Sequence, residues 1–196
     1  MSNLIEVIKS KIISLKQNEK EALNFREQSS DFDLSSRNYL KFKGQYKKIA
    51  AVFILLREAK KEVTVILTRR AKNLSSHPGQ ISFPGGVVEA KDATILSTAL
   101  REVREEIGLS NNMIETIGAL RPHETVSKFL IHPFVGIIDS SAKFKINHCE
   151  VAEIFEVPLV FLLNRSNMAK HKIQKEKYQV GYYAIPYGPY YIWGAT

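Results

Sequence analysis

Three glutamates near the middle of the chain have the spacing of a metal-binding carboxylate group. Glu102, Glu105 and Glu106 stand at positions i, i+3 and i+4, which share one face of an α-helix. Carboxylates this close repel one another by roughly 0.2–0.5 kcal/mol per pair. Mg²⁺ or Mn²⁺ relieves such repulsion, because these hard cations take carboxylate oxygens as ligands and keep positions for water and phosphate. The alternative is a solvated acidic face flanked by Arg101 and Arg104.

A glycine pair upstream strengthens the metal hypothesis. Pro84-Gly85-Gly86 precedes Glu102 by a short stretch, with Gly86 standing 16 residues before it. Two glycines let the backbone approach a ligand closely and offer it a carbonyl or N–H group. A Gly-Gly pair alone is more often only a turn. Next to a helix that carries carboxylates, it indicates a site for metal and phosphate.

The carboxylates belong to a helix predicted over residues 93–107. Its apolar side chains repeat with helical spacing at Leu96, Ala99, Leu100, Val103 and Ile107, which gives the helix one face to bury. Asp92 or Thr94 can cap its start. Gly108 suits the left-handed position that ends it.

The remaining pattern predicts one α/β domain with a mixed sheet and helices on its faces. Residues 1–46 comprise an amphipathic helix at 4–24, with Leu4, Ile8 and Ile12 on its apolar stripe, and a polar connector at 26–46. Residues 47–196 form the main domain. Strands are predicted at 49–56, 63–67, 81–83, 114–120, 129–138, 178–187 and 190–193, and the apolar segment 151–163 is interrupted by Pro158.

Composition narrows the setting. The 196 residues include one cysteine, Cys149, which excludes an intrachain disulfide and a zinc site built from several cysteines. The sequence has no apolar run long enough to cross a membrane and no secretory signal pattern, so we expect a cytoplasmic protein. The formal net charge of +8 has two interpretations: a surface kept soluble by charge, or an anionic partner such as a nucleotide.

The central motif resembles the Nudix box, written G-x5-E-x7-R-E-U-x-E-E-x-G-U with U an aliphatic residue. Each defined position from Arg101 to Leu109 agrees with it. Asp92 replaces the first glutamate of the box, and eight residues instead of seven separate it from Arg101. The extra residue is similar to the box of the coenzyme A diphosphatase branch of this family.

That branch has an upstream signature, L-L-T-x2-S-x3-R-x3-G-x3-F-P-G-G, which resembles residues 66–86. Here Ala71 stands at the serine position and Ser75 at the arginine position. The similarity continues at 131–135, 150–159 and 192–196, so it covers roughly residues 49–196. In similar proteins a helix follows the final Trp-Gly-Ala-Thr segment, which implies a chain shortened at its C-terminus.

The resemblance implies a Nudix-type α/β/α sandwich and assigns roles to the motif residues. It implies that Glu102, Glu105 and Glu106, with the Gly85 carbonyl, hold Mg²⁺ or Mn²⁺. Arg101 is expected to orient a glutamate rather than touch substrate. The catalytic base is one of the box glutamates or Glu150 from a distant loop.

Other residues are weighed against ordinary structural roles. Arg69, Arg70 and Lys72 follow a strand end and are predicted to contact substrate phosphate, together with the backbone of Gly85 and Gly86. The five histidines show no paired ligand spacing and are interpreted as structural or surface residues. The tyrosines at 182, 183, 187, 190 and 191 are interpreted as strand packing rather than a base-stacking platform.

The predicted function is metal-dependent hydrolysis of a diphosphate bond in a nucleotide derivative. The resemblance implies coenzyme A or acyl-CoA as substrate, yielding 3′,5′-ADP and (acyl-)4′-phosphopantetheine. One alternative is a Nudix diphosphatase for ADP-ribose, a sugar nucleotide or an RNA 5′ end. Another is a nucleotide- or RNA-binding module without turnover. We expect a small-molecule, CoA-like nucleotide as partner, with nucleic acid less favoured, no membrane, and a monomer or homodimer.

Overall fold

The computed structural model describes residues 3–19, 29–30, 46–59, 62–175 and 178–196. Within these residues the larger sheet has nine strands. Its strands are β1 (Ser29–Ser30), β2 (Lys48–Ala59), β3 (Glu62–Arg70), β4 (Ile81–Ser82), β5 (Gly85–Val87), β6 (Ile114–Ala119), β7 (His123–Glu124), β8 (Phe129–Ile138) and β9 (Val151–Pro158).

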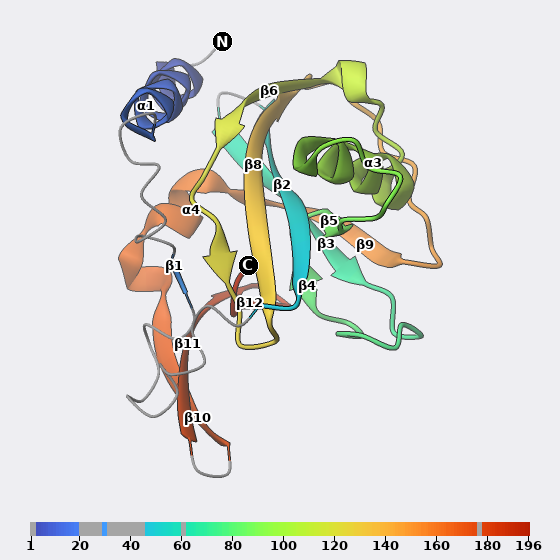
Figure 1. The fold of residues 1–196 in the computed structure, drawn as a ribbon. Coiled ribbons are helices and arrows are strands. Elements are labelled where there is room, and N and C mark those ends of the chain that lie inside the picture. The colour runs from blue at the N-terminus through green and yellow to red at the C-terminus, as the bar shows by residue number, and fades with distance from the viewer. Residues whose placement is uncertain (1–2, 20–28, 31–45, 60–61, 176–177) are drawn as a thin grey trace.

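The sheet is mixed, as the sequence predicts. The long strands β2 and β8 run parallel, in register from Lys48 opposite Phe129 to Arg57 opposite Ile138. Antiparallel partners flank them: β3 and β5 pair with β2, β9 pairs with β3, and β6 pairs with β8. The last residues of β2 pair with β3, while the first half of β2 pairs with β5 (Figure 1). The glycine loop is therefore held against the middle of the sheet.

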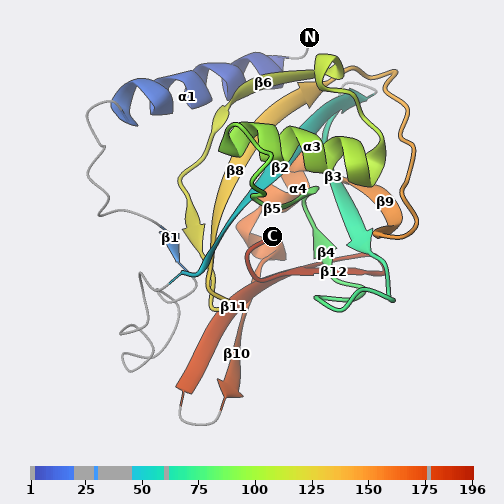
Figure 2. The same cartoon turned by 45° about the vertical axis from the view of Figure 1, so that its right-hand side comes forward.

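Helices cover both faces of this sheet, which confirms the predicted α/β/α sandwich (Figures 1 and 2). On one face, α3 (Ile95–Ile107) packs its apolar stripe on Phe53 and Leu55 of β2. On the other face, α1 (Asn3–Glu19) and α4 (Leu159–Leu163) pack near Leu56. Alternate residues of β2 point to opposite faces, so one strand supplies both cores.

The N-terminal helix is part of the sandwich. Ile5 is 1% exposed and joins the core beside Val63 and Ile117. Lys9 Nζ lies 2.8 Å from Glu115 Oε1 of β6. The predicted apolar stripe runs through Leu4 and Ile8 and omits Ile5, which is the most buried of the helix residues whose burial the structure describes. Predicted helical positions 20–24 and most of the connector at 26–46 lie outside the described residues.

A smaller sheet of three strands lies beside the sandwich, among the residues that the structure describes. It consists of β10 (Ala169–Lys175), β11 (Tyr178–Tyr187) and β12 (Tyr190–Trp193), paired antiparallel. The sequence predicts β11 and β12 but not β10, whose lysines obscure its alternation. The far end of β10 and β11 extends away from the body of the protein (Figures 1 and 2).

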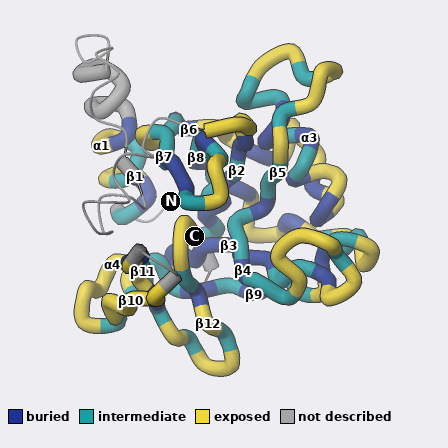
Figure 3. Tube along the Cα trace, turned by 60° about the horizontal axis from the view of Figure 1, so that its bottom comes forward, coloured by how far each residue is buried: buried dark blue, intermediate teal, exposed yellow. Residues whose placement is uncertain are grey.

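Aromatic packing joins the smaller sheet to the larger one. Phe155 of β9 and Tyr190 of β12 stack with their ring centroids 3.6 Å apart. Ile192 packs with Leu67 and Ile81 in the same core. Burial is continuous through the central strands, while the loops around them are exposed (Figure 3). In the described part of the chain, no helix is both long and apolar enough to cross a membrane.

Candidate active site

Both ends of α3 are fixed by local hydrogen bonds. The Thr94 hydroxyl accepts a hydrogen bond from the Ser97 N–H at 3.0 Å, and the Ser97 hydroxyl accepts one from the Thr94 N–H at 2.9 Å. Thr94, one of the two predicted residues, is therefore the N-cap. Gly108 ends the helix with φ of 69°, as expected for a left-handed terminal position. The helix is thereby held in one register, with its carboxylates facing the glycine loop.

Three carboxylates meet at this loop. One oxygen each from Glu102, Glu106 and Glu150 lies within 4.8 Å of the others. Glu102 and Glu106 come from α3, whereas Glu150 comes from the turn before β9. Glu106 is 2% exposed. Such a group of oxygens matches the ligand preference of a hard divalent cation.

The electrostatics of the cluster also favour a cation. Burial, followed by the charge of Glu102, raises the pKa of Glu106 to about 8. Burial also raises the pKa of Glu102, against the opposing effect of Arg101. Arg70 Nη1 lies 4.0 Å from Glu106 Oε1, and the Gly85 N–H donates to Glu106 Oε2 at 3.4 Å. These two contacts are long, so they balance negative charge on Glu106 only weakly.

Neighbouring atoms approach Gly85 and Gly86 so closely that neither position has room for a side chain. Gly85 has φ of 154°, and a Cβ atom there would lie 2.6 Å from the Cα atom of Val52. A Cβ atom on Gly86 would overlap the carboxylate of Glu102. Any larger residue would displace strand β2 or a cluster carboxylate. The predicted roles of the Gly85 carbonyl and of Gly86 in binding stay predictions.

Arg101 is the buried centre of a hydrogen-bond network. Its Nε and Nη2 atoms donate to Asp92 at 2.8 and 2.9 Å, and Nη1 donates to Glu102 at 2.7 Å and to Glu105 at 2.9 Å. The Arg101 guanidinium holds the pKa of Asp92 well below its usual range. Asp92, at the place of the first box glutamate, therefore anchors the arginine that orients Glu102.

Glu105 lies outside the three-carboxylate cluster. Its carboxylate is bound by Arg101 and lies 3.8 Å from Lys91 Nζ. The geometry groups Glu150, rather than Glu105, with the other two glutamates. Because Glu105 is already paired with cationic side chains, its predicted role as a metal ligand stays a prediction.

The predicted phosphate contacts are divided between two environments. Arg70 faces the carboxylate cluster, and its Nε atom also donates to the Ser76 carbonyl at 3.3 Å. Arg69 Nη2 lies 2.7 Å from Glu153 Oε2, away from the cluster. Lys72 is exposed in the loop after β3. The structure thus brings Arg70 to the candidate metal site and shows, among the residues it describes, no contact of Arg69 or Lys72 with the cluster.

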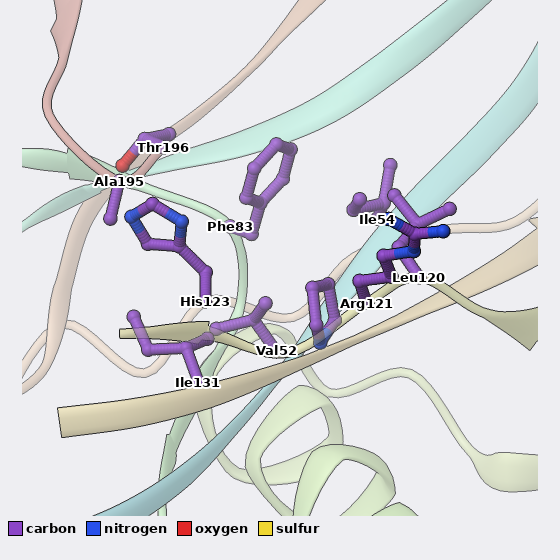
Figure 4. A pocket seen from close by; sticks show the side chains of 10 residues that line it. Val52, Ile54, Phe83, Leu120, Arg121, His123, Ile131, Ala195 and Thr196 are labelled. Atoms are coloured by element: carbon purple, nitrogen blue, oxygen red, sulfur yellow. The ribbon is translucent and has the colours of Figure 1, made fainter. Parts of the chain in front are cut away.

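An apolar hollow of about 400 Å³ opens on the opposite face of the sheet from α3. Val52 lines it and is paired with Gly85 in the strand register. Phe83, two residues before Gly85, lies on another side of the hollow, with His123 and Thr196 nearby (Figure 4). The glycine loop therefore borders both the carboxylate cluster and this hollow.

Asn147 is the main residue of the site that sequence reasoning missed. Its Nδ2 atom donates to Glu150 Oε1 at 3.0 Å, and its N–H donates to the Glu106 carbonyl at 3.0 Å. Its own carbonyl accepts the N–H groups of Glu150 and Val151. Asn147 thus ties the end of α3 to the turn that carries Glu150. An asparagine three residues before a glutamate is too common a pattern to reveal this.

Comparisons with known proteins define the family. A family model for the NUDIX domain matches residues 47–176. The protein named uncharacterized Nudix hydrolase NudL of Photorhabdus laumondii is 38% identical over 137 residues, which span 70% of this chain and 73% of that protein. NudL of an Enterobacter species is 37% identical over 147 residues, which span 75% of this chain and 76% of that protein.

A solved structure shows the same fold. The crystal structure of a C. elegans Ap4A hydrolase binary complex matches with a TM-score of 0.50 at 16% identity, over 60% of this chain and 84% of that one. The chain belongs to the Nudix family. It is a hydrolase that acts on diphosphate bonds, as the motif predicts. Nudix enzymes generally use divalent cations, which the carboxylate cluster suits.

The buried carboxylate predicts how metal-free protein responds to pH. Because the pKa of Glu106 rises from 4.5 to about 8 on folding, the folded state holds this proton more tightly than the unfolded chain does. Stability in chelator should therefore fall as the pH rises through this window. Glu106→Gln should remove the decline and also the stabilisation that added Mn²⁺ gives the natural protein. Thermal unfolding at several pH values measures both effects, with Glu62→Gln as an exposed control. A variant that keeps the same decline would contradict the role of Glu106.

The contact from Asn147 predicts a loss of metal affinity without loss of fold. Asn147→Ala frees the carboxylate of Glu150, and changes to residues that orient ligands typically weaken metal binding by about 10- to 100-fold. Mn²⁺ titration followed by electron paramagnetic resonance measures the affinity. Asn112→Ala, at an exposed position, is the matched control. Equal affinities in the two variants would show that Asn147 does not position Glu150.

Proposed function

We propose that this hydrolase splits the diphosphate bond of coenzyme A or an acyl-CoA, giving 3′,5′-ADP and (acyl-)4′-phosphopantetheine. The observation that carries the substrate proposal is the segment Ile66–Gly86, most of which matches the signature of the coenzyme A branch. The longer spacing between Asp92 and Arg101 supports the same branch. We propose Mg²⁺ or Mn²⁺ as the cation, because all side-chain ligands of the cluster are oxygens.

The roles of the side chains follow from their positions. Glu102, Glu106 and Glu150 hold the cation, which when bound neutralises charge on the phosphoryl oxygens and lowers the pKa of water. Arg101 keeps Glu102 in place through its contact at 2.7 Å. Arg70 lies beside the cluster and is placed to contact a phosphate. The proton of the attacking water goes to Glu150 or to a glutamate of the box, on a carboxylate oxygen that does not hold the cation.

The apolar hollow supports a substrate with a long uncharged part. Its volume of about 400 Å³ falls in the range usual for small-molecule sites, roughly 300–1,000 Å³. Most of its lining side chains are aliphatic or aromatic, among them Val52, Ile54 and Ile131. The hollow borders the glycine loop at Val52 and Phe83, and we propose that it receives the pantetheine or acyl arm while the diphosphate lies at the carboxylates.

A specific observation bears on each of two alternative functions. Ser75 stands where the coenzyme A branch has an arginine, so we expect a weaker preference for substrates with a 3′-phosphate. This substitution favours other nucleotide diphosphates such as ADP-ribose. A binding module without turnover is disfavoured, because the three carboxylates are assembled around Glu106. We propose a cytoplasmic enzyme that acts on a small nucleotide as monomer or homodimer, with nucleic acid a less favoured partner.

The substrate proposal predicts that coenzyme A and dephospho-coenzyme A are comparable substrates. Ser75 lies next to Ser76, whose carbonyl accepts a hydrogen bond from Arg70, so an arginine there would add a cation beside the phosphate site. A charge-assisted hydrogen bond contributes about 1.5–3 kcal/mol. Ser75→Arg should therefore sharpen the preference for the 3′-phosphate by about ten-fold or more.

The measurement is kcat/KM for coenzyme A, dephospho-coenzyme A and ADP-ribose in both proteins. Ser75→Gln is the matched control, since it adds length without charge. The coenzyme A proposal fails if ADP-ribose is preferred by a wide margin and Ser75→Arg changes nothing. The assignment of a diphosphatase would survive that result.

Glu106→Gln should lower turnover by about 10² to 10⁴ because it removes a ligand charge.

A further inference from the structure

A second hollow lies beside the end of β3 and is lined by more polar and aromatic residues than the apolar one. It has a volume of about 260 Å³ and lies between the loop at residues 78–81 and strand β12. Three aromatic residues line it, Tyr190, Tyr191 and Trp193, and Arg69 and Gln80 also belong to its lining. The function derived above does not use these aromatic residues.

The rings of Tyr191 and Trp193 contact other aromatic side chains. Tyr182 contacts Trp193 edge to face, with ring centroids 5.2 Å apart. His171 stacks on Tyr182 at 5.4 Å and meets Tyr191 at 6.4 Å. Tyr191 is nevertheless 44% exposed. Rings fixed in this way can receive a planar ligand with little further loss of conformational freedom.

Polar groups lie at the border of the same hollow. Arg69 is paired with Glu153 at 2.7 Å, and Glu153 also accepts a hydrogen bond from the Tyr190 hydroxyl. Gln80 Oε1 lies 2.9 Å from His77 Nδ1. The lining of the hollow therefore includes polar groups, at Arg69, Gln80 and Tyr190, besides Tyr191 and Trp193. This combination suits a flat heterocycle whose edge carries both donors and acceptors, rather than an aliphatic chain.

Two consecutive residues at the end of β3 connect the hollow with the carboxylate cluster. Arg69 lines the hollow, while the next residue, Arg70, lies 4.0 Å from Glu106. Consecutive Cα atoms are about 3.8 Å apart, and their side chains on a strand point to opposite faces. A nucleotide that bends over the end of β3 can thus place its phosphates at Arg70 and its base beyond Arg69.

We propose that this hollow binds the adenine ring of the substrate, with Tyr191 and Trp193 as its stacking surface. The inference rests on the proposed function, because it takes the substrate to be an adenine nucleotide derivative. It also assigns the two ends of that substrate to different places. The adenosine end lies at β12, and the uncharged arm lies in the apolar hollow beside Val52.

The chain offers a direct test, because Trp193 is its sole tryptophan. Tryptophan fluorescence of the chelator-treated protein therefore reports on this hollow without any need for turnover. Titration with 3′,5′-ADP should quench the emission to a saturating value, whereas 4′-phosphopantetheine should leave it unchanged. Tyr191→Leu should weaken binding of 3′,5′-ADP by roughly 5- to 100-fold, the usual effect of losing one stacking ring.

Two variants separate stacking from general damage. Tyr191→Phe keeps the ring and should bind 3′,5′-ADP as the natural protein does. Tyr183→Leu changes a tyrosine that is 39% exposed on the other side of β11, and it should also bind normally. Equal weakening by Tyr183→Leu and Tyr191→Leu would overturn the proposal.

The outcomes also separate this proposal from the proposed function. Unchanged fluorescence in an enzyme that hydrolyses coenzyme A would show that adenine binds elsewhere, and the subsite would be wrong. Saturable quenching by 3′,5′-ADP in a protein that does not hydrolyse coenzyme A would support the subsite. The coenzyme A proposal would then be the one that fails.

Discussion

The repulsion among three gathered carboxylates is the constraint on which the site depends. Glu102, Glu106 and Glu150 meet within 4.8 Å, and burial makes the charge on Glu106 costly enough to raise its pKa to about 8. The fold nevertheless holds them together: α3 is capped at both ends, the glycine loop leaves room for the carboxylates, and Asn147 ties the third glutamate to the helix. A divalent cation would balance this charge, so the arrangement is best explained as a metal site.

The buried side chain of Arg101 keeps the charged carboxylate of Glu102 in one orientation. Arg101 forms hydrogen bonds with Asp92 on one side and with Glu102 and Glu105 on the other. The change from glutamate to aspartate in the box, together with the extra residue, is therefore compatible with the structure. Asp92 anchors the network and does not enter the carboxylate cluster. Arg101 thereby links Asp92, which precedes the helix, to a carboxylate of the cluster.

Much of the fold was predictable because its signals are local. The apolar stripe of α3, its Thr94 cap and its terminal Gly108 all lie within a short stretch, and the observed helix follows them. The apolar runs that predict β2 and β8 are equally local, and the structure pairs these two strands. Strand β10 was missed because its lysines resemble a solvated charge run. Its pairing with β11 becomes visible only in the structure. Ile5 was missed because its burial depends on the neighbouring sheet.

The candidate site divides in the same way. Residues of one motif were predictable together. The approach of Asn147 and Glu150 to Glu106 was not, because it brings together positions more than 40 residues apart in the chain. The most direct test of the account is anomalous diffraction from crystals grown with Mn²⁺. The account predicts a manganese peak within bonding distance of carboxylate oxygens from Glu102, Glu106 and Glu150. A manganese peak remote from all three carboxylates would contradict it.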